Sequence, residues 1–222
     1  MEGNEKSLFI IGDVHGCWHT YQELLNYWDP ENEILIQLGD LVDRGNFSPQ
    51  SLDLSQELQR EFPDRTVFLR GNHEQMMLRY LKGEDTKGHW LSNGGAFTMA
   101  GFADFPVPPS AFLGWLESRE LVWENESVFV SHAGVTHTQN PYNVDDPKGV
   151  LWNRGPWKNI GKLQVIGHSP QLNGKATFSP GPPVWNVDTG AFKGICLTGI
   201  KLDHQGRLLE EINIPTIDLD VN

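Results

Sequence analysis

The 222-residue chain has little cysteine, a shortage of basic residues and no long hydrophobic run. Its two cysteines, Cys17 and Cys196, are far apart, so their spacing indicates neither a disulfide framework nor a thiolate metal site, and both are expected to be free thiols. The opening residues are charged and the apolar run that follows is short, so neither a signal sequence nor a membrane helix is predicted. The expected compartment is the cytoplasm.

The acidic net charge of the chain limits the kinds of molecule that it is expected to bind. Lys and Arg number 17 against 29 Asp and Glu, a formal net charge of −12 at pH 7. Nucleic acids and anionic membranes need a basic footprint, so neither is expected to bind. A cluster of metal cations reverses an acidic field locally, so a phosphorylated substrate is compatible with this charge. The hydrophobic fraction of 38% and the eight Trp favour one compact domain spanning residues 1–222.

A short motif at residues 39–45, Gly-Asp-Leu-Val-Asp-Arg-Gly, places two carboxylates and a guanidinium between glycines. The apolar residues 34–38 predict a buried strand before it. Asp40 therefore emerges where strand gives way to loop, the usual place for a ligand in open α/β sheets. Taken alone, the motif is equally typical of a solvated turn, since Gly and Asp are common turn residues.

The same construction recurs at four further predicted strand ends. These are Gly12-Asp13-Val14-His15-Gly16, Gly71-Asn72-His73-Glu74, Ser131-His132-Ala133-Gly134 and Gly167-His168. Five strand ends that deliver Asp, His and Asn are hard to explain as independent turns. The pattern predicts a phosphate-handling metal site built from these loops.

The order of elements indicates an α/β protein. The first half alternates strands, expected at 7–12, 33–38 and 66–69, with helices beginning near Trp18, Ser48 and His73. Residues 82–126 predict a small, mostly helical insertion. The second half is strand-rich, with strands expected at 127–131, 163–167, 183–187, 194–202 and 208–214. We therefore expect a sandwich in which this half forms the second, antiparallel or mixed sheet, and an acidic surface tail at 216–222.

The ordered motifs resemble the phosphoprotein phosphatases among the calcineurin-like metallophosphoesterases, and are most similar to their compact bacterial and phage members. The resemblance extends over nearly the whole chain. Its supporting stretches are residues 70–77, 89–95, 151–155, 167–170 and 188–192. It implies a metallophosphoesterase sandwich of two mixed β-sheets flanked by helices, with a small helical insertion.

The resemblance also implies two divalent metal ions that share one carboxylate. The first ion would be held by Asp13, His15 and Asp40, and the second by Asp40, Asn72, His132 and His168. Imidazole, carboxylate and amide oxygen suit Mn²⁺, Fe or Zn²⁺, and Mn²⁺ is the metal we expect. A hydroxide bridging the two ions would attack phosphorus directly, so no covalent phosphoenzyme is expected.

Five further residues receive roles from the resemblance. His73 resembles the general acid and Asp43 the carboxylate that orients it and keeps its imidazolium populated. Arg44, Arg70 and Arg154 resemble substrate-binding phosphate ligands, because the guanidinium fork suits phosphoryl oxygens. For Arg70, bracing of its loop through an acidic residue is the alternative.

These residues predict a hydrolase, a metal-dependent protein serine/threonine phosphatase that acts on phosphorylated proteins or peptides, with phosphotyrosine left open. The alternative is a symmetrical bis(5'-nucleosyl)-tetraphosphatase, which shares the metal motifs. Asp43-Arg44 and Glu74 favour the phosphatase, because the tetraphosphatase pattern has a different residue before the arginine and Asp after Gly-Asn-His. A metal-binding module without catalysis is disfavoured by the complete ligand set. The oligomeric state is not predicted.

Overall fold

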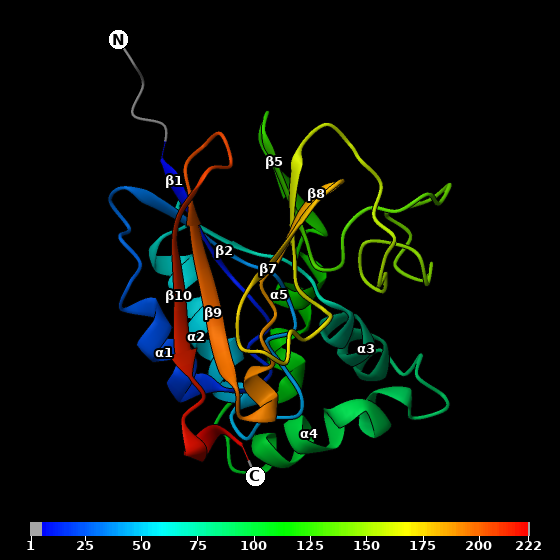
Figure 1. The fold of residues 1–222 in the computed structure, drawn as a ribbon. Helices are drawn as coiled ribbons and strands as arrows, with labels where there is room; N and C mark the ends of the chain where they lie inside the picture. The colour runs from blue at the N-terminus through cyan, green and yellow to red at the C-terminus, as the bar shows by residue number, and fades with distance from the viewer. Residues whose placement is uncertain (1–5, 222) are drawn as a thin grey trace.

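The computed structural model describes residues 6–221, whose strands form two mixed β-sheets of five strands each (Figure 1). The first sheet has the strand order β10-β9-β1-β2-β3, with β1, β2 and β3 parallel and β9 antiparallel to both of its neighbours. Its strands are β1 (Ser7–Ile11), β2 (Glu33–Gln37), β3 (Thr66–Phe68), β9 (Cys196–Leu202) and β10 (Leu208–Pro215).

The second sheet has the order β4-β5-β6-β8-β7. The three inner strands β5, β6 and β8 are parallel, and the two edge strands are antiparallel to them. Its strands are β4 (Val122–Glu124), β5 (Val128–Ser131), β6 (Leu163–Ile166), β7 (Thr177–Pro180) and β8 (Pro183–Asn186). The expected sandwich of two mixed sheets is confirmed.

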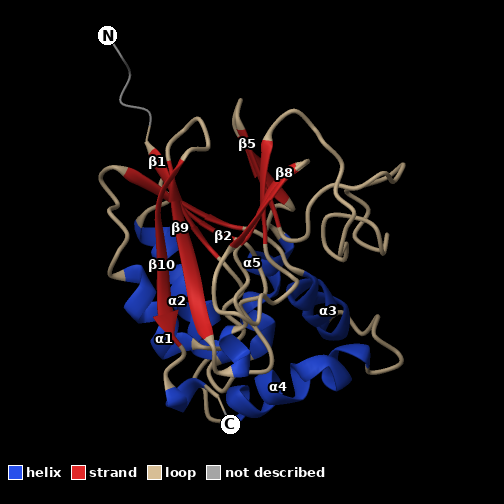
Figure 2. Ribbon diagram, in the orientation of Figure 1, coloured by secondary structure: helices blue, strands red, loops and turns tan. Residues whose placement is uncertain are grey.

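Helices flank the sheets, with α1 on one side of the strands and α3 on the other (Figure 2). The α-helices are α1 (Trp18–Leu25), α2 (Ser48–Glu61), α3 (Asn72–Leu81), α4 (Ala96–Ala103) and α5 (Leu113–Glu117). Short turns of other helix types are η1 (Leu91–Gly95), η2 (Pro109–Phe112), η3 (Ala191–Lys193) and η4 (Asp218–Asp220). Between residues 6 and 221, none of the helices has the length and apolar character needed to span a bilayer.

The sequence of β1 explains the layered core. Side chains of a strand point alternately to its two faces. Leu8 and Ile10 belong to a buried cluster that includes residues of β5 and β6 in the facing sheet. Phe9 and Ile11 belong to the cluster formed with α1 and α2. A strand buried on both faces is apolar at every position, which is why this run does not alternate with polar residues.

The division of the sheets along the sequence differs from the prediction. Strands β9 and β10 come from the second half of the chain but complete the first sheet, because β1 lies in its middle and pairs with β2 on one side and β9 on the other. The second sheet is instead completed by β4 and β7, two short edge strands that the sequence did not reveal. Strand β4 also ends the mostly helical insertion at 82–126.

The acidic end of the chain is not the free surface tail that was expected. Asp220 is fully buried. Its Oδ1 accepts hydrogen bonds from the backbone N–H and ring Nδ1 of His19, at 3.1 and 2.8 Å, and its Oδ2 accepts from the backbone N–H and Oγ1 of Thr20, at 2.8 and 2.6 Å. The carboxylate therefore caps the start of α1. The main-chain oxygen of Asp220 also accepts the N–H of Asn46 at 2.9 Å, which ties this end to the loop after β2.

This contact predicts a loss of stability on Asp220→Asn. The amide cannot accept hydrogen bonds at both ends, so at least one buried donor of residues 19–20 loses its partner. Such a loss costs about 1–3 kcal/mol of unfolding free energy, measured by urea denaturation. Asp218→Asn is the matched control, because Asp218 lies in the same turn but is exposed. Equal stability of the two variants would contradict the capping role.

Candidate metal-dependent active site

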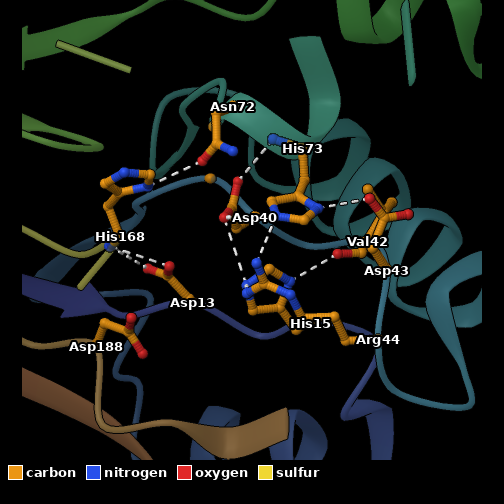
Figure 3. Close-up of polar contacts among 12 residues, drawn as sticks. Asp13, His15, Asp40, Val42, Asp43, Arg44, Asn72, His73, His168 and Asp188 are labelled. Carbon is orange, nitrogen blue, oxygen red and sulfur yellow. Dashed lines mark hydrogen bonds and ion pairs between the residues drawn. The ribbon is translucent and has the colours of Figure 1, made fainter. Parts of the chain in front are cut away.

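Loops that follow six strands bring the predicted site residues to one place. They leave β1, β2 and β3 in one sheet and β5, β6 and β8 in the other. Figure 3 shows their side chains converging. In chain order the predicted residues are Asp13 and His15, then Asp40, Asp43 and Arg44, then Asn72 and His73, then His132, then His168; Asp188, which was not predicted, joins them after β8. The shared edge of two sheets thus gathers residues that are far apart in the sequence.

Asp40 lies at the centre of the cluster (Figure 3). Its Oδ2 is 3.4 Å from Nε2 of His15, 3.4 Å from Nε2 of His132 and 3.9 Å from Nε2 of His73. Its Oδ1 accepts the backbone N–H of His73 at 3.0 Å. Burial favours the neutral acid, but the surrounding histidines outweigh it and hold the pKa of Asp40 below its usual range. Asp40 is therefore an ionised carboxylate faced by imidazoles from three loops.

The backbone of the loop that carries Asp40 is hydrogen-bonded to the side chain of Glu74. One carboxylate oxygen of Glu74 accepts the N–H groups of Asp40 and Gly71, at 2.7 and 2.8 Å. The other accepts those of Leu41 and Val42, at 2.8 and 3.3 Å. One side chain of α3 thus fixes the backbone of two neighbouring loops. Burial, joined by the charge of Asp40, raises the pKa of Glu74 to about 7.

Close backbone contact between these two loops requires glycine. Gly39 has φ +90°, and a Cβ there would lie 2.2 Å from the backbone nitrogen of Gly71. A Cβ on Gly71 would in turn lie 2.1 Å from Oδ1 of Asp40. A side chain at either position would push the loops apart, so these glycines set how closely the ligands approach.

Backbone strain is concentrated in the site. Among the described residues, the non-glycine positions with positive φ are His15, Asp40, Asp43, Arg44 and His168. Such conformations cost about 1–3 kcal/mol each and persist where the surroundings over-determine them. Glu74 supplies part of that support for Asp40. Each of these positions was predicted as a site residue, so strain and predicted chemistry coincide.

The histidine rings are oriented by main-chain oxygens. Nδ1 of His15 donates to the carbonyl of Val42 at 2.8 Å, and Nδ1 of His132 donates to that of Leu38 at 3.0 Å. Each ring therefore presents an Nε2 lone pair to Asp40. His168 is turned the other way, with Nδ1 3.0 Å from Oδ1 of Asn72.

Burial keeps these three rings neutral. It is the largest cause that lowers the pKa of His15, His132 and His168, in the last case to about 3. Neutral imidazole is the form that binds metal ions. The protonation states therefore suit ligation at neutral pH.

The donor set fits two metal ions. Ligand atoms of His15, Asp40 and His73 lie within 4.8 Å of one another, and so do those of Asp40, His132 and His168. Asp40 belongs to both groups. Oδ1 of Asn72, 2.9 Å from Nε2 of His132, adds an oxygen to the second. Nitrogen and oxygen donors without thiolate favour a catalytic transition-metal site.

Asp13, which was predicted as a ligand of the first ion, lies against this cluster. Its carboxylate accepts the backbone N–H of His168, at 3.0 Å from Oδ2 (Figure 3). Burial, together with the charges of Asp188 and Asp40, raises the pKa of Asp13 well above its usual range. The structure thus places Asp13 near Asp40, while the first group of converging ligand atoms contains His73 in its place.

His73 and Asp43 form a tight pair beside Asp40. Nδ1 of His73 lies 2.6 Å from Oδ2 of Asp43, and its Nε2 points to Asp40. Burial opposes protonation of His73, but the charges of Asp40 and Asp43 outweigh it and raise the pKa of the ring. His73 thus differs from the three neutral rings around it, in the direction expected of a proton donor.

The three arginines predicted to bind phosphate lie in different places. Arg44 reaches into the site, with Nη1 2.6 Å from Nε2 of His15 and Nη2 2.9 Å from Nε2 of His73. Arg154 stands at the rim, where its Nη1 donates to the carbonyl of His168 at 3.2 Å and to Oγ of Ser169 at 3.0 Å.

The structure does not bring Arg70 to the site. Its guanidinium donates to Oε1 of Gln75 at 3.0 Å and to the carbonyls of Glu117 and Arg119, at 2.6 and 3.1 Å. These contacts brace the end of the insertion through main-chain oxygens and an amide, and the charges of Glu74 and Glu117 also act on the guanidinium, in line with the bracing alternative.

An open cavity of about 580 Å³ leads to the cluster. Asp40, Arg44, His73, Arg154 and His168 form its polar floor. Its outer wall contains Met76, Arg79, His89, Trp90 and Trp152, from α3, the insertion and the long connection before β6. The volume is in the range of sites that hold a small molecule or one side chain of a larger substrate.

A two-sheet sandwich with buried His and Asp residues at its strand ends defines a metallophosphoesterase. The family model for calcineurin-like phosphoesterases matches residues 6–204, and the chain belongs to this family. Members use a dinuclear metal site, in accord with the two groups of ligand atoms.

Individual relatives differ in the activity that their names state. The chain is 35% identical over 212 residues to serine/threonine-protein phosphatase 1 of Salmonella typhimurium, covering 88% of this chain and 91% of the relative. It is 31% identical over 136 residues to a symmetrical bis(5'-nucleosyl)-tetraphosphatase of Methylococcus capsulatus, covering 60% and 45%. A crystal structure of a putative diadenosine tetraphosphatase shares the fold, with a TM-score of 0.65, 20% identity and coverage of 96% and 95%.

Asp188 was missed in the sequence, and Glu74 was used there only to favour one substrate, without a role in building the site. Asp188 is buried, and burial raises its pKa to about 7. It directly follows the strand expected at 183–187, so the strand-end rule that found Asp40 also applied to it. The contribution of Glu74 to the loop backbone left no such signal, because it depends on the approach of two loops.

Arg154 and Arg70 give contrasting predictions. Arg154→Ala removes the rim cation that the sequence predicts to be a phosphate ligand; in that role the fork would contact phosphate before and during reaction, so KM should rise about tenfold while kcat falls less. Arg70→Ala removes the brace on residues 117–119 and should lower the melting temperature with KM unchanged. Steady-state kinetics with p-nitrophenyl phosphate and thermal denaturation separate the two. A tenfold rise in KM for Arg70→Ala would restore it to the substrate site.

Proposed function

We propose that this chain is a metal-dependent protein serine/threonine phosphatase, with phosphotyrosine as a further candidate substrate. The observation that carries the proposal is the His73–Asp43 pair, at 2.6 Å, beside the central carboxylate. The oxygen that leaves from phosphoserine or phosphothreonine is an alkoxide, a strong base that needs a proton as the bond breaks. A nucleotide leaving group is a weak base and needs no such donor. A pair built to keep imidazole protonated therefore suits alkyl phosphates.

We propose two divalent ions, with Mn²⁺ as the metal. Asp13, His15 and Asp40 would hold one, and Asp40, Asn72, His132 and His168 the other; Fe and Zn²⁺ suit the same donors. When bound, such a pair of ions acidifies water and neutralises charge on the phosphoryl group. Activity should then be lost with a chelator and return better with Mn²⁺ than with Mg²⁺, because imidazole is a poor ligand for the harder ion.

Arg44 and Arg154 would bind the phosphoryl oxygens from two sides. The Arg44 fork now lies across ring nitrogens of His15 and His73. Phosphoryl oxygens carry formal charge and are stronger acceptors than neutral imidazole, so a bound phosphate draws the fork toward itself. That movement frees Nε2 of His73 to hold the proton that it gives to the leaving oxygen. Asp43 stabilises the imidazolium and keeps the ring directed at the cavity.

Of the two sequence relatives described above, the phosphatase matches over the larger share of its length. The Salmonella protein matches over 91% of its length, whereas the tetraphosphatase match covers 45% of that relative. Glu74, whose two carboxylate oxygens reach N–H groups of both loops, and Asp43 before Arg44 are the residues that differ from the tetraphosphatase pattern. The tetraphosphatase is therefore retained as the competing outcome of the test.

The direct test is a substrate panel with Mn²⁺-loaded protein. Phosphoserine, phosphothreonine and phosphotyrosine peptides, p-nitrophenyl phosphate and diadenosine tetraphosphate are compared by kcat/KM. We expect the phosphoserine and phosphothreonine peptides to be turned over more efficiently than the dinucleotide. Preferred cleavage of diadenosine tetraphosphate would overturn the proposal.

The role of His73 gives a sharper prediction. General acid catalysis is worth about 10²–10⁴-fold where a leaving group needs a proton. Because p-nitrophenolate leaves without one, His73→Asn should reduce kcat/KM for a phosphoserine peptide far more than for p-nitrophenyl phosphate. His89→Asn is the control, since His89 lines the same cavity but lies outside the cluster. Equal losses on both substrates at matched metal content would withdraw the general-acid role.

A further inference from the structure

Two side chains of the insertion at residues 82–126 hydrogen-bond to Asp43, the partner of His73 in the proposed proton-donating pair (the acid pair). Nε1 of Trp90 donates to the Asp43 carboxylate, at 2.9 Å from Oδ2 and 3.1 Å from Oδ1. Oγ1 of Thr98 donates to Oδ1 at 2.6 Å. His73 donates to Oδ2 at 2.6 Å. Both oxygens of Asp43 are thus held, and two of their three donors come from the insertion.

Burial makes this arrangement restrictive. Asp43, Trp90 and Thr98 are each 0% exposed, so water does not replace a lost donor easily. Rotation of the carboxylate about its Cβ–Cγ bond moves both oxygens together, so the bond to His73 cannot be redirected without also disturbing the bonds to Trp90 and Thr98. The direction in which Asp43 presents its oxygen to His73 is therefore set by the insertion.

The insertion also holds the backbone of Asp43. Oγ1 of Thr98 accepts the N–H of Asp43 at 3.0 Å while donating to its side chain. Asp43 and Arg44 have φ of +76° and +73°, a strained conformation for residues with side chains. Gly94, itself at φ +109°, packs on this turn so closely that a Cβ would lie 3.1 Å from Cγ of Arg44 and 3.2 Å from Cβ of Asp43.

The donors are themselves fixed. The ring of Trp90 packs against Tyr80 of α3 with 4.9 Å between centroids, and its backbone N–H donates to Asp85 at 2.9 Å. Gly95 lies under the indole, where a Cβ would come within 2.5 Å of the ring. Trp90 also lines the cavity beside His73. The same segment therefore forms a wall of the cavity and aims the acid pair.

We infer that Trp90 and Thr98 are positioning residues for the proton transfer, and that the insertion is a working part of the active site. The inference rests on the proposed acid role of His73, but not on the identity of the substrate. Loss of either donor should let Asp43, and with it His73, leave the productive orientation. The turnover of substrates with strongly basic leaving groups should suffer most.

The test compares phenyl phosphate with p-nitrophenyl phosphate, two substrates of similar shape whose leaving groups differ in basicity. Trp90→Phe keeps an aromatic ring and removes the N–H, and Thr98→Val keeps the shape and removes the hydroxyl. Outer hydrogen bonds of metal sites are typically worth about 10–100-fold in activity. We expect each variant to lose about tenfold or more in kcat on phenyl phosphate, with little change in KM and a much smaller loss on p-nitrophenyl phosphate.

Two controls separate positioning from packing. Trp115→Phe removes another indole N–H of the insertion, one that donates to Gln59 at 2.7 Å, and should leave the ratio of the two activities unchanged. Thr98→Ser restores the hydroxyl and should recover the ratio that Thr98→Val loses. Metal content and melting temperature are measured for every variant.

An equal loss on both phosphates, no loss, or failure of Thr98→Ser to recover would overturn the inference. If the proposed protein phosphatase activity is wrong but the positioning role is right, the experiments give a different result. In that case the wild-type protein prefers the dinucleotide to phosphopeptides, while the ratio of the two aryl phosphates still changes in Trp90→Phe and Thr98→Val.

Discussion

The burial of five carboxylates in one cluster is the constraint on which the rest of the structure depends. Asp13, Asp40, Asp43, Glu74 and Asp188 are each no more than 2% exposed. Unpaired buried charge is costly, so such a cluster persists only where cations or hydrogen-bond donors compensate it. Asp43 and Glu74 are met by donors of the protein itself. Asp13, Asp40 and Asp188 each accept a backbone N–H but also face one another, with Arg44 and Arg154 as the nearby cations, and divalent metal ions are the compensation that this arrangement fits.

The fold meets this constraint with rigid strands and strained loops. Parallel strands of both sheets end at the same edge, so short loops deliver ligands without long flexible side chains. Positive φ at His15, Asp40 and His168 turns the loops sharply enough for the ligands to converge. The hydrogen bonds to Glu74 and the close backbone approach of Gly39 and Gly71 stabilise that loop geometry. The strain is thus stored where the predicted chemistry lies.

The sequence revealed those parts of the site that depend on local pattern. An apolar run followed by Gly and a polar ligand can be recognised from a few neighbouring residues, which is why Asp40 and His132 were found, and the same rule extends to Asp188. Contacts between distant segments leave no such pattern. The pairing of β9 with β1, the bonds of Trp90 and Thr98 to Asp43, and the turn of Arg70 toward residues 117–119 all depend on tertiary approach. The resemblance supplied roles but not these contacts.

The central claim is that Asp40 is the carboxylate shared by two metal ions. Anomalous diffraction at the manganese edge, from crystals grown with Mn²⁺, measures this directly. We expect two peaks about 3.5–4 Å apart, one on each side of the Asp40 carboxylate. One peak should lie by His15 and the other by Asn72, His132 and His168. A single peak, or two peaks that Asp40 does not touch, would contradict it.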